Sequence, residues 1–113
     1  MNEYKRGDVF YANLTPVVGS EQGGLRPVVI VSNNIGNHHS TIITVAVLTS
    51  RFKKMLPTHV AIPKGSGGLI YDSCVMAEQL RSIDKQRLTG YMGSLNEQQM
   101  SKIDQAIKIA LAL

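Results

Sequence analysis

An arginine and a hydroxyl pair are the residues of this chain best suited to chemistry. Arg26 follows a glycine-rich stretch, residues 19–24, and precedes a run of apolar residues. Thr49 and Ser50 end a second apolar segment. An arginine side chain stays charged at every physiological pH and presents a planar fork of donors that matches a phosphate group. An arginine held near a hydroxyl group therefore suits the binding of phosphate and the stabilisation of its charge.

A purely structural interpretation of the same residues stays open at this point. Arg26 could lie at a strand edge and pair with Glu21, in a surface ion pair that contributes little. Thr49 and Ser50 could simply terminate a strand. A third polar cluster, Glu78, Gln79 and Arg81, follows an apolar segment; amide and guanidinium groups can contact bases or phosphates, or can be an ordinary polar strand end.

Metal binding and cysteine chemistry are not favoured. His38 and His39 are adjacent in a polar stretch, and His59 and Cys74 are distant from them and from each other, so no spacing typical of a metal site occurs. Cys74 is the only cysteine and lies in an apolar segment, where cysteines are usually unreactive and where no internal disulfide can form. The sequence therefore predicts no metal and no cofactor.

The positive charge of the chain is unevenly distributed. The net charge is +4; residues 1–64 carry seven Lys and Arg against three Asp and Glu, whereas residues 65–113 carry five against five. The whole excess lies in the half that contains Arg26 and Thr49. This distribution favours a polyanionic partner, such as nucleic acid or an acidic protein tail, although solubilising charge alone would look similar.

The elements that must position these residues are mostly short strands. β-prone or apolar segments cover residues 9–14, 28–31, 41–48, 58–62, 73–77 and 90–93. Glycine, proline and asparagine mark the connections: a long one at 15–25, a turn at 33–37, a basic loop at 50–57 and a flexible turn at 64–68. Residues 82–88 could hold one helical turn.

The last element is a helix predicted over residues 95–111. Ser94 and Glu97 have the spacing of a capping box, and apolar residues then recur at helical spacing from Met100 to Leu111. The 113 residues fit one domain, 1–113. The fold class is therefore mainly β (α+β): a small, mostly antiparallel barrel or half-barrel with a C-terminal α-helix.

Localisation follows from what the sequence lacks. The N-terminus has no apolar stretch typical of a signal peptide, and no apolar run approaches the length of a membrane span. With a single cysteine as well, the simplest expectation is a cytoplasmic protein that does not bind membranes.

In order along the chain, the segments resemble the MazF/PemK-like toxins of bacterial toxin–antitoxin pairs, over about residues 4–111. The segments that carry the resemblance are RGDV at 6–9, GSEQGG at 19–24, RPVVI at 26–30, LTS at 48–50, LPTHV at 56–60, Glu78-Gln79 with Arg81, IDK at 83–85 and RL at 87–88. The LPTHV and IDK-x-RL segments look most like the branch of this family found in low-GC Gram-positive bacteria. The chain departs from that branch near residues 64–71, which bears on substrate preference.

The resemblance implies a fold, an activity and a catalytic pair. The fold is an SH3-like or gyrase-poison-like barrel that forms a homodimer. The activity is metal-independent, sequence-selective cleavage of single-stranded RNA: the ribose 2′-hydroxyl attacks the adjacent phosphorus and leaves a 2′,3′-cyclic phosphate and a 5′-hydroxyl. Such cleavage of mRNA would inhibit translation and growth. Carried over by motif, Arg26 and Thr49 are the catalytic residues.

Physical chemistry assigns the roles within that reaction. The nucleophile belongs to the RNA, so the enzyme must align it and stabilise charge on the phosphoryl oxygens. Arg26 suits this electrostatic role better than that of a base, because its pKa is too high. Glu21 is the candidate base, or the residue that orients Arg26. The candidate RNA contacts are Ser20, Gln22, Ser50, Arg51, Phe52, Lys53, His59, Gln79, Arg81 and Arg87.

Partners and rival functions complete the expectations. The same basic groove would accept an acidic antitoxin whose disordered tail folds on binding. One rival is a gyrase poison on the same fold, but such proteins end in a tripeptide with tryptophan and this chain has no tryptophan. A second rival is a non-catalytic barrel that binds RNA or protein, which would bind RNA without cleaving it.

Overall fold

The computed structural model describes residues 3–16, 18, 19, 21 and 23–113. In this part of the chain the strands are β1 (Asp8–Asn13), β2 (Leu25–Ile30), β3 (Ile42–Thr49), β4 (His59–Ile62), β5 (Ser73–Asp84) and β6 (Leu88–Ser94). The α-helices are α1 (Asn34–His39) and α2 (Glu97–Leu111), and single 3₁₀ turns form at η1 (Ser66–Gly68) and η2 (Lys85–Arg87).

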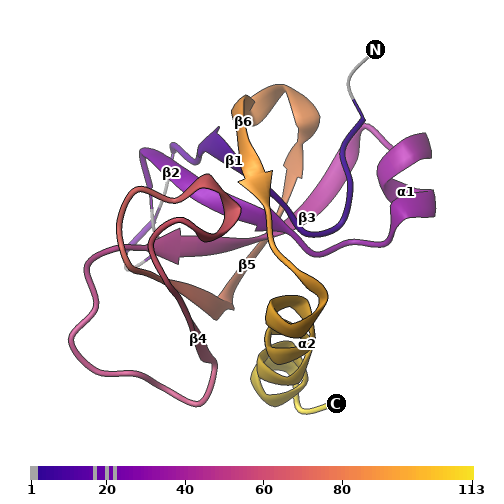
Figure 1. Cartoon of the computed structure of the whole chain (residues 1–113). Coiled ribbons are helices and arrows are strands. Elements are labelled where there is room, and N and C mark those ends of the chain that lie inside the picture. The colour runs from indigo at the N-terminus through magenta and orange to yellow at the C-terminus, as the bar shows by residue number, and fades with distance from the viewer. Residues whose placement is uncertain (1–2, 17, 20, 22) are drawn as a thin grey trace.

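The strands form one antiparallel sheet in the order β4-β5-β3-β2-β1-β6. Helix α2 lies against one face of this sheet (Figure 1). Helix α1 connects the C-terminal end of β2 to the N-terminal end of β3. The predicted class, a mainly antiparallel β fold with a C-terminal helix, is confirmed. The second half of β5, residues 78–84, was not predicted as strand, because its polar composition resembles that of a loop.

Apolar residues are buried on both faces of the sheet. One cluster joins the sheet to α2 and includes Val29, Leu48, Val75 and Ile103. The other cluster, which includes Val28, Val47 and Met76 from neighbouring strands, contains no residue of α2. A sheet face that is buried without a helix over it must curve around its own side chains, which explains the barrel-like shape.

Strand β5 bends in its middle at an irregularity of pairing. Ala46 pairs with Leu80, whereas the next residue of β3, Val47, pairs with Met76. Three extra residues, 77–79, therefore bulge out of β5, and bulges of this kind bend a strand and redirect its side chains. Glu78 and Gln79, predicted to lie at a strand end, lie instead in this bulge.

The N-terminus of α2 differs from the prediction. The capping box is formed by Asn96 and Gln99, not by Ser94 and Glu97: the Asn96 side chain accepts from Gln99 N–H at 2.8 Å, and the Gln99 side chain accepts from Asn96 N–H at 3.0 Å. Ser94 is the last residue of β6, and its hydroxyl donates to Asp8 Oδ1 at 2.7 Å. Both pairs have the required spacing, and the tertiary contact with Asp8 decides between them.

Two predicted turns also take a different form. The segment 33–37 begins α1, because the Asn33 side chain accepts from Gly36 N–H at 2.8 Å and caps a short helix. The segment 64–68, predicted to be flexible, forms the tight turn η1, in which Gly67 is buried. A Cβ atom on Gly68 would lie 2.0 Å from the backbone oxygen of Met92 in β6. These glycines therefore permit a close backbone contact and are not a loose connection.

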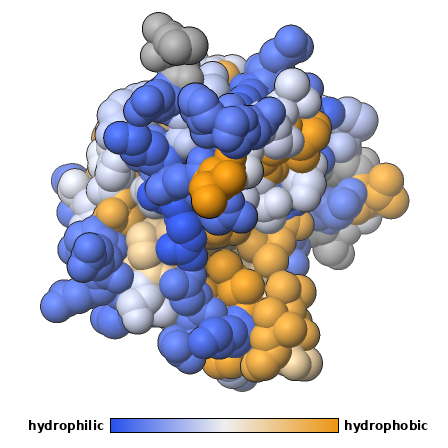
Figure 2. Space-filling view, turned by 90° about the vertical axis from the view of Figure 1, so that its right-hand side faces the viewer, coloured by the Kyte–Doolittle hydropathy of each residue, from blue (hydrophilic) through white to orange (hydrophobic). Residues whose placement is uncertain are grey.

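The C-terminal half of α2 leaves apolar side chains at the surface. Figure 2 shows an apolar area at the bottom of the face it presents, at the level of α2. A groove there is lined by Val31, Leu80, Ile107, Leu111 and Leu113 together with polar residues of α2. Within the described residues, no helix is both long and apolar enough to cross a membrane.

Candidate active site

Arg26 and Thr49 line the same pocket. The pocket has a volume of about 190 Å³ and is lined by Tyr11, Leu25, Arg26, Pro27, Leu48, Thr49, Ser50, Leu69, Ile70, Tyr71, Ser73 and Met92. The sheet explains the meeting of the two residues. Val28 pairs with Val47, and extending that antiparallel register by two residues, beyond the last pair, places Arg26 opposite Thr49.

The guanidinium of Arg26 is held by its own loop. Its Nε donates to the carbonyl oxygen of Gly23 at 3.0 Å. Among the described residues, none accepts a hydrogen bond from its two terminal nitrogens. These nitrogens form the part of the guanidinium that binds two oxygens of a phosphate at once. The side chain is half-buried, so its charge is both fixed in place and accessible from the pocket.

The hydroxyl of Thr49 is fixed where β3 ends. Thr49 is buried, with 6% of its surface exposed. Its Oγ1 accepts from Arg51 N–H at 3.1 Å and lies 3.4 Å from the Arg51 carbonyl oxygen, to which it donates weakly. The backbone amide of Arg51 thus orients the oxygen, while the hydroxyl proton can turn from this long contact to a better acceptor.

Glu21 does not lie where a partner of Arg26 would. Its carboxylate accepts from Val18 N–H, and its own N–H donates to Val18 O at 3.2 Å, so the side chain closes a turn within the loop. In the described part of the chain, no ion pair joins Glu21 to Arg26, and the pocket lining contains no Asp or Glu. The residue that orients Arg26 is therefore Gly23, through its carbonyl oxygen.

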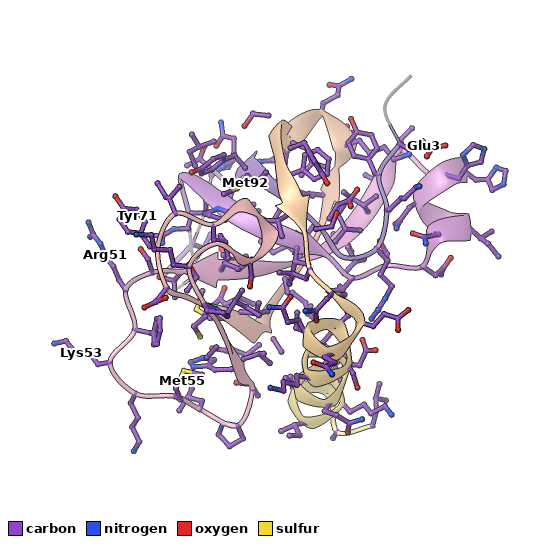
Figure 3. All side chains as sticks on the ribbon, viewed as in Figure 1. Glu3, Arg51, Lys53, Met55, Tyr71 and Met92 are labelled. Atoms are coloured by element: carbon purple, nitrogen blue, oxygen red, sulfur yellow. The ribbon has the colours of Figure 1, made fainter. Side chains whose placement is uncertain are left out.

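Tyrosine and methionine side chains of the pocket were not among the predicted site residues. Tyr11 comes from β1. Tyr71 comes from the segment between η1 and β5, and Met92 comes from β6 (Figure 3). Tyr71 has 63% of its surface exposed, so its ring is accessible from solvent at the edge of the pocket. The glycines at 65–68 could have indicated this site residue from the sequence, because the turn that they form contacts β6 and places the following residues, including Tyr71, beside the sheet.

The basic loop between β3 and β4 contributes exposed charge beside the pocket. Ser50 lines the pocket, and the side chains of Arg51 and Lys53 point away from the body of the protein (Figure 3). Phe52, one of the predicted RNA contacts, is half-buried and packs against the core cluster that contains no residue of α2. It anchors the loop that carries the two cations.

His59 is held by both of its ring nitrogens. Nδ1 accepts from Leu56 N–H at 3.2 Å, and Nε2 lies 2.8 Å from Glu78 Oε2. The tautomer that satisfies both contacts carries its proton on Nε2 and donates it to Glu78. Only 9% of the His59 side chain is exposed, so this predicted RNA contact instead links the basic loop to the bulge of β5.

The Glu78 carboxylate gives the protein a pH-dependent contribution to stability. Burial raises the pKa of Glu78, but hydrogen bonds from His59 and Thr58 outweigh burial and hold the pKa below its ordinary value of 4.5. Because the folded-state pKa is the lower one, the charge stabilises the fold fully above pH 4.5. This contribution is lost as the pH falls through the folded-state value.

We therefore expect Glu78→Gln to unfold more easily in urea at pH 7 than the parent protein does. The difference between the two proteins should shrink as the pH falls from 4.5 through the folded-state pKa of Glu78, since below that value both proteins are uncharged at this position. Thr58→Val, which removes one of the hydrogen bonds, should move this decline toward higher pH. A difference between the proteins that is the same at pH 3 and pH 7 would contradict the assignment.

The remaining predicted contacts fall into three groups. Gln79 is half-buried in the β5 bulge. Arg81 and Arg87 donate to backbone carbonyl groups near the end of β1, at distances of 2.7–3.1 Å, and so do not point freely into solvent. Ser20 and Gln22 lie outside the described residues.

Cys74 and the possible metal ligands are separate from the pocket. Cys74 is fully buried, and its burial, followed by the nearby charge of Glu78, raises the pKa of its thiol to about 11. A thiol with such a pKa remains protonated and unreactive at neutral pH. In the residues that the structure describes, no three side chains of His, Cys, Asp or Glu gather as a metal site would require.

The chain is similar to known proteins over almost its full length. Residues 5–111 match the family described as the PemK-like, MazF-like toxin of type II toxin–antitoxin systems. The chain is 51% identical to the endoribonuclease EndoA of Bacillus subtilis over 110 residues, which cover 96% of the chain and 95% of EndoA. It is 46% identical to the endoribonuclease MazF of Staphylococcus saprophyticus, over 96% of the chain and 92% of that protein.

A solved structure supports the same grouping. It is a mycobacterial endoribonuclease in complex with its cognate antitoxin, 30% identical to this chain, with a TM-score of 0.81 and coverage of 96% of this chain and 95% of that one. The family match and both curated relatives span nearly the whole sequence. The chain belongs to the PemK-like, MazF-like toxins of type II toxin–antitoxin systems.

Proposed function

We propose that this protein is the toxin of a toxin–antitoxin pair and acts as a sequence-specific endoribonuclease on single-stranded mRNA. The observation that carries the proposal is that the fixed guanidinium of Arg26 and the oriented hydroxyl of Thr49 line the same pocket. Relatives that are 46–51% identical are named endoribonucleases, and this supports the same activity here.

The proposed reaction uses a nucleophile from the RNA itself. The ribose 2′-oxygen forms a bond to the adjacent phosphorus and loses its proton, while the bond from phosphorus to the 5′-oxygen breaks and that oxygen gains a proton. The products are a 2′,3′-cyclic phosphate and a 5′-hydroxyl, and no water is consumed. Arg26 would bind the phosphoryl oxygens with its two terminal nitrogens as their charge grows, and Thr49 would add one donor.

The geometry argues against Glu21 as the group that moves the proton. Glu21 is predicted from the sequence as a base, but its carboxylate is engaged by Val18 and lies outside the pocket lining. Electrostatic stabilisation by Arg26 is the catalytic contribution that the pocket geometry supports. If Glu21→Gln keeps full activity across the pH range, Glu21 is not the base.

Partners and location form part of the same proposal. A homodimer and an acidic antitoxin are expected partners, and the mycobacterial relative has been solved with its cognate antitoxin. Exposed apolar residues at the end of α2, among them Leu111 and Leu113, offer an interaction surface of the kind that protein partners cover. We place the protein in the cytoplasm, where mRNA is translated.

The decisive experiment incubates the purified protein with a long single-stranded RNA in excess EDTA. Discrete fragments with 5′-hydroxyl ends are expected, and mapping those ends gives the cleaved sequence. RNA that remains intact but is bound would identify a non-catalytic RNA-binding protein. RNA that is neither cut nor bound would redirect attention to a topoisomerase target.

Tyr71 is expected to stack on a base of the bound RNA. Replacing Tyr71 with Ala should weaken binding of single-stranded RNA by about 1–3 kcal/mol, the usual range for the loss of one stacked base. Tyr71→Phe keeps the ring and should bind nearly as well as the parent. Fluorescence anisotropy with an RNA blocked by 2′-O-methyl groups measures binding without cleavage, and equal affinities for all three proteins would exclude stacking at Tyr71.

A further inference from the structure

Two arginines lie at the base of the connection from β1 to β2. Arg81, from the second half of β5, donates from Nη1 to the carbonyl oxygen of Leu14 at 2.8 Å. Arg87, from the 3₁₀ turn η2, donates from Nη1 to Asn13 O at 3.1 Å and to Thr15 O at 2.7 Å. Three consecutive carbonyl groups are thus bound by residues 67–74 positions away in sequence.

The strand pairing explains why β6 provides no partner for these carbonyl groups. Strand β6 pairs with β1 only as far as Ala12, which lies opposite Leu88 at the start of β6. The backbone of β1 continues beyond that point without a neighbouring strand on this side. Leu14 is buried, so its carbonyl group requires a donor, and Arg81 supplies it. Asn13 and Thr15 are exposed, and Arg87, the residue just before β6, binds their carbonyl groups where β6 does not reach.

The bound segment leads directly to the active-site arginine. Leu14 N–H donates to Gly24 O at 2.9 Å, so the two ends of the connection are joined. The neighbouring carbonyl, that of Gly23, accepts from Arg26 Nε at 3.0 Å. Hydrogen bonds, joined by short stretches of backbone at residues 13–15 and 23–24, thus connect Arg81 and Arg87 to Arg26.

The internal structure of residues 13–15 strengthens this link. The Asn13 side-chain oxygen accepts from Thr15 N–H at 3.1 Å and from Thr15 Oγ1 at 2.6 Å, which forms a compact turn. A turn that is closed internally moves as a unit. Displacing it by loss of Arg81 or Arg87 would therefore displace Gly24 as well.

We propose that Arg81 and Arg87 are positioning residues that set the placement of Arg26, and that they do not act as phosphate contacts. The inference rests on the proposed ribonuclease function for its effect on rate, but not for its effect on the loop. It reverses the sequence-based expectation that both arginines bind RNA. Their charge is permanent, so the effect does not depend on pH in the physiological range.

The two roles differ in how the affinity for RNA depends on salt. An arginine that neutralises a phosphate of single-stranded RNA contributes about 0.7 to the slope of log affinity against log salt concentration. A positioning arginine contributes nothing to that slope, but its loss lowers kcat, since small misplacements of a catalytic group cost up to about 100-fold in rate.

The experiment compares Arg87→Gln and Arg81→Gln with Arg51→Gln as the matched control, because Arg51 points into solvent from the basic loop. Both positioning variants should keep the salt slope of the parent for a 2′-O-methyl RNA while kcat falls about 10-fold or more. Arg51→Gln should show the reduced slope of a phosphate contact. Arg87→Lys keeps a charged donor and should recover part of the lost kcat.

Hydrogen exchange supplies a readout that does not need enzyme activity. The Leu14 amide, which donates to Gly24, should exchange about 10-fold faster in Arg87→Gln, whereas core amides of β3 should be unchanged. A reduced salt slope with unchanged kcat, or a lower kcat without faster exchange at Leu14, would overturn the proposal. If the parent protein cleaves no RNA, the proposed function fails, while the exchange result still decides whether the arginines hold the loop.

Discussion

Replacing Arg26 with Ala is expected to lower kcat for RNA cleavage by at least about 100- to 1,000-fold, the usual cost of removing one preorganised donor to a developing oxyanion. The effect should be large because Arg26 supplies charge and two donors at once, from a side chain already fixed by Gly23. Arg26→Lys keeps the charge but loses the planar fork, so its kcat should be intermediate and closer to that of the alanine variant.

Two variants of Thr49 distinguish the contribution of its hydroxyl to catalysis from the contribution of its side chain to the fold. Thr49→Val keeps the shape and removes the hydroxyl, and should lower kcat by a smaller factor than Arg26→Ala does. Thr49→Ser keeps the hydroxyl and should retain most of the activity. Single-turnover cleavage of an RNA with one mapped site measures these rates, and binding of the 2′-O-methyl RNA serves as the control for affinity.

One result would exclude the proposed role of Arg26. If Arg26→Ala cleaves within about threefold of the parent and shows the same urea midpoint, Arg26 does not stabilise the transition state. A large loss of kcat that is accompanied by a large loss of stability would instead assign Arg26 a structural role. Because the Arg26 side chain is half-buried, a structural role would also appear as a lower urea midpoint, which unfolding measures without any assay of activity.

Replacing Gly68 with Ala is expected to destabilise the fold by about 3 kcal/mol or more, from the sum of two costs. Its φ is +74°, a conformation that costs a residue with a Cβ about 1–2 kcal/mol. The new Cβ would also meet the backbone oxygen of Met92 at 2.0 Å, and backbone atoms on both sides must then separate. The urea midpoint at constant m measures the loss.

Two further glycines act as matched controls for Gly68. Gly65 has φ +94°, but a Cβ added there would meet no atom within 4 Å, so Gly65→Ala should lose only the conformational part, about 1–2 kcal/mol. A Cβ on Gly93 in β6 would lie 2.7 Å from the carbonyl carbon of Gly67, so Gly93→Ala tests the close contact from the opposite side. Equal losses for Gly65→Ala and Gly68→Ala would show that the contact with β6 contributes nothing.

The Gly68 contact should also affect activity. It joins η1 to β6, and the pocket wall includes Met92 from β6 and Leu69, Ile70 and Tyr71 just after η1. If the Gly68→Ala variant still folds, it should therefore bind RNA more weakly than the parent protein does. The folded Gly65→Ala variant should bind RNA as tightly as the parent. Residues 69–71, just after η1, thus form part of the pocket wall.

The sequence by itself determined the class of fold and the catalytic candidates. Continuous β-branched runs predict buried strands, and an apolar stripe at helical spacing predicts α2, because these patterns depend only on neighbours along the chain. Arg26 and Thr49 were found because they stand at strand ends, within motifs shared with the MazF/PemK-like toxins. Their common pocket follows from the register of β2 and β3.

Only the tertiary structure decided how the other polar side chains are used. Arg81, Arg87 and His59 are residue types that bind RNA, and local sequence carries no sign that backbone carbonyls or a carboxylate already engage them. Ser94 lost its capping role to a contact with Asp8, 86 residues away. Such contacts join segments distant in sequence, so they depend on strand order and register, which the pattern of single residues does not encode.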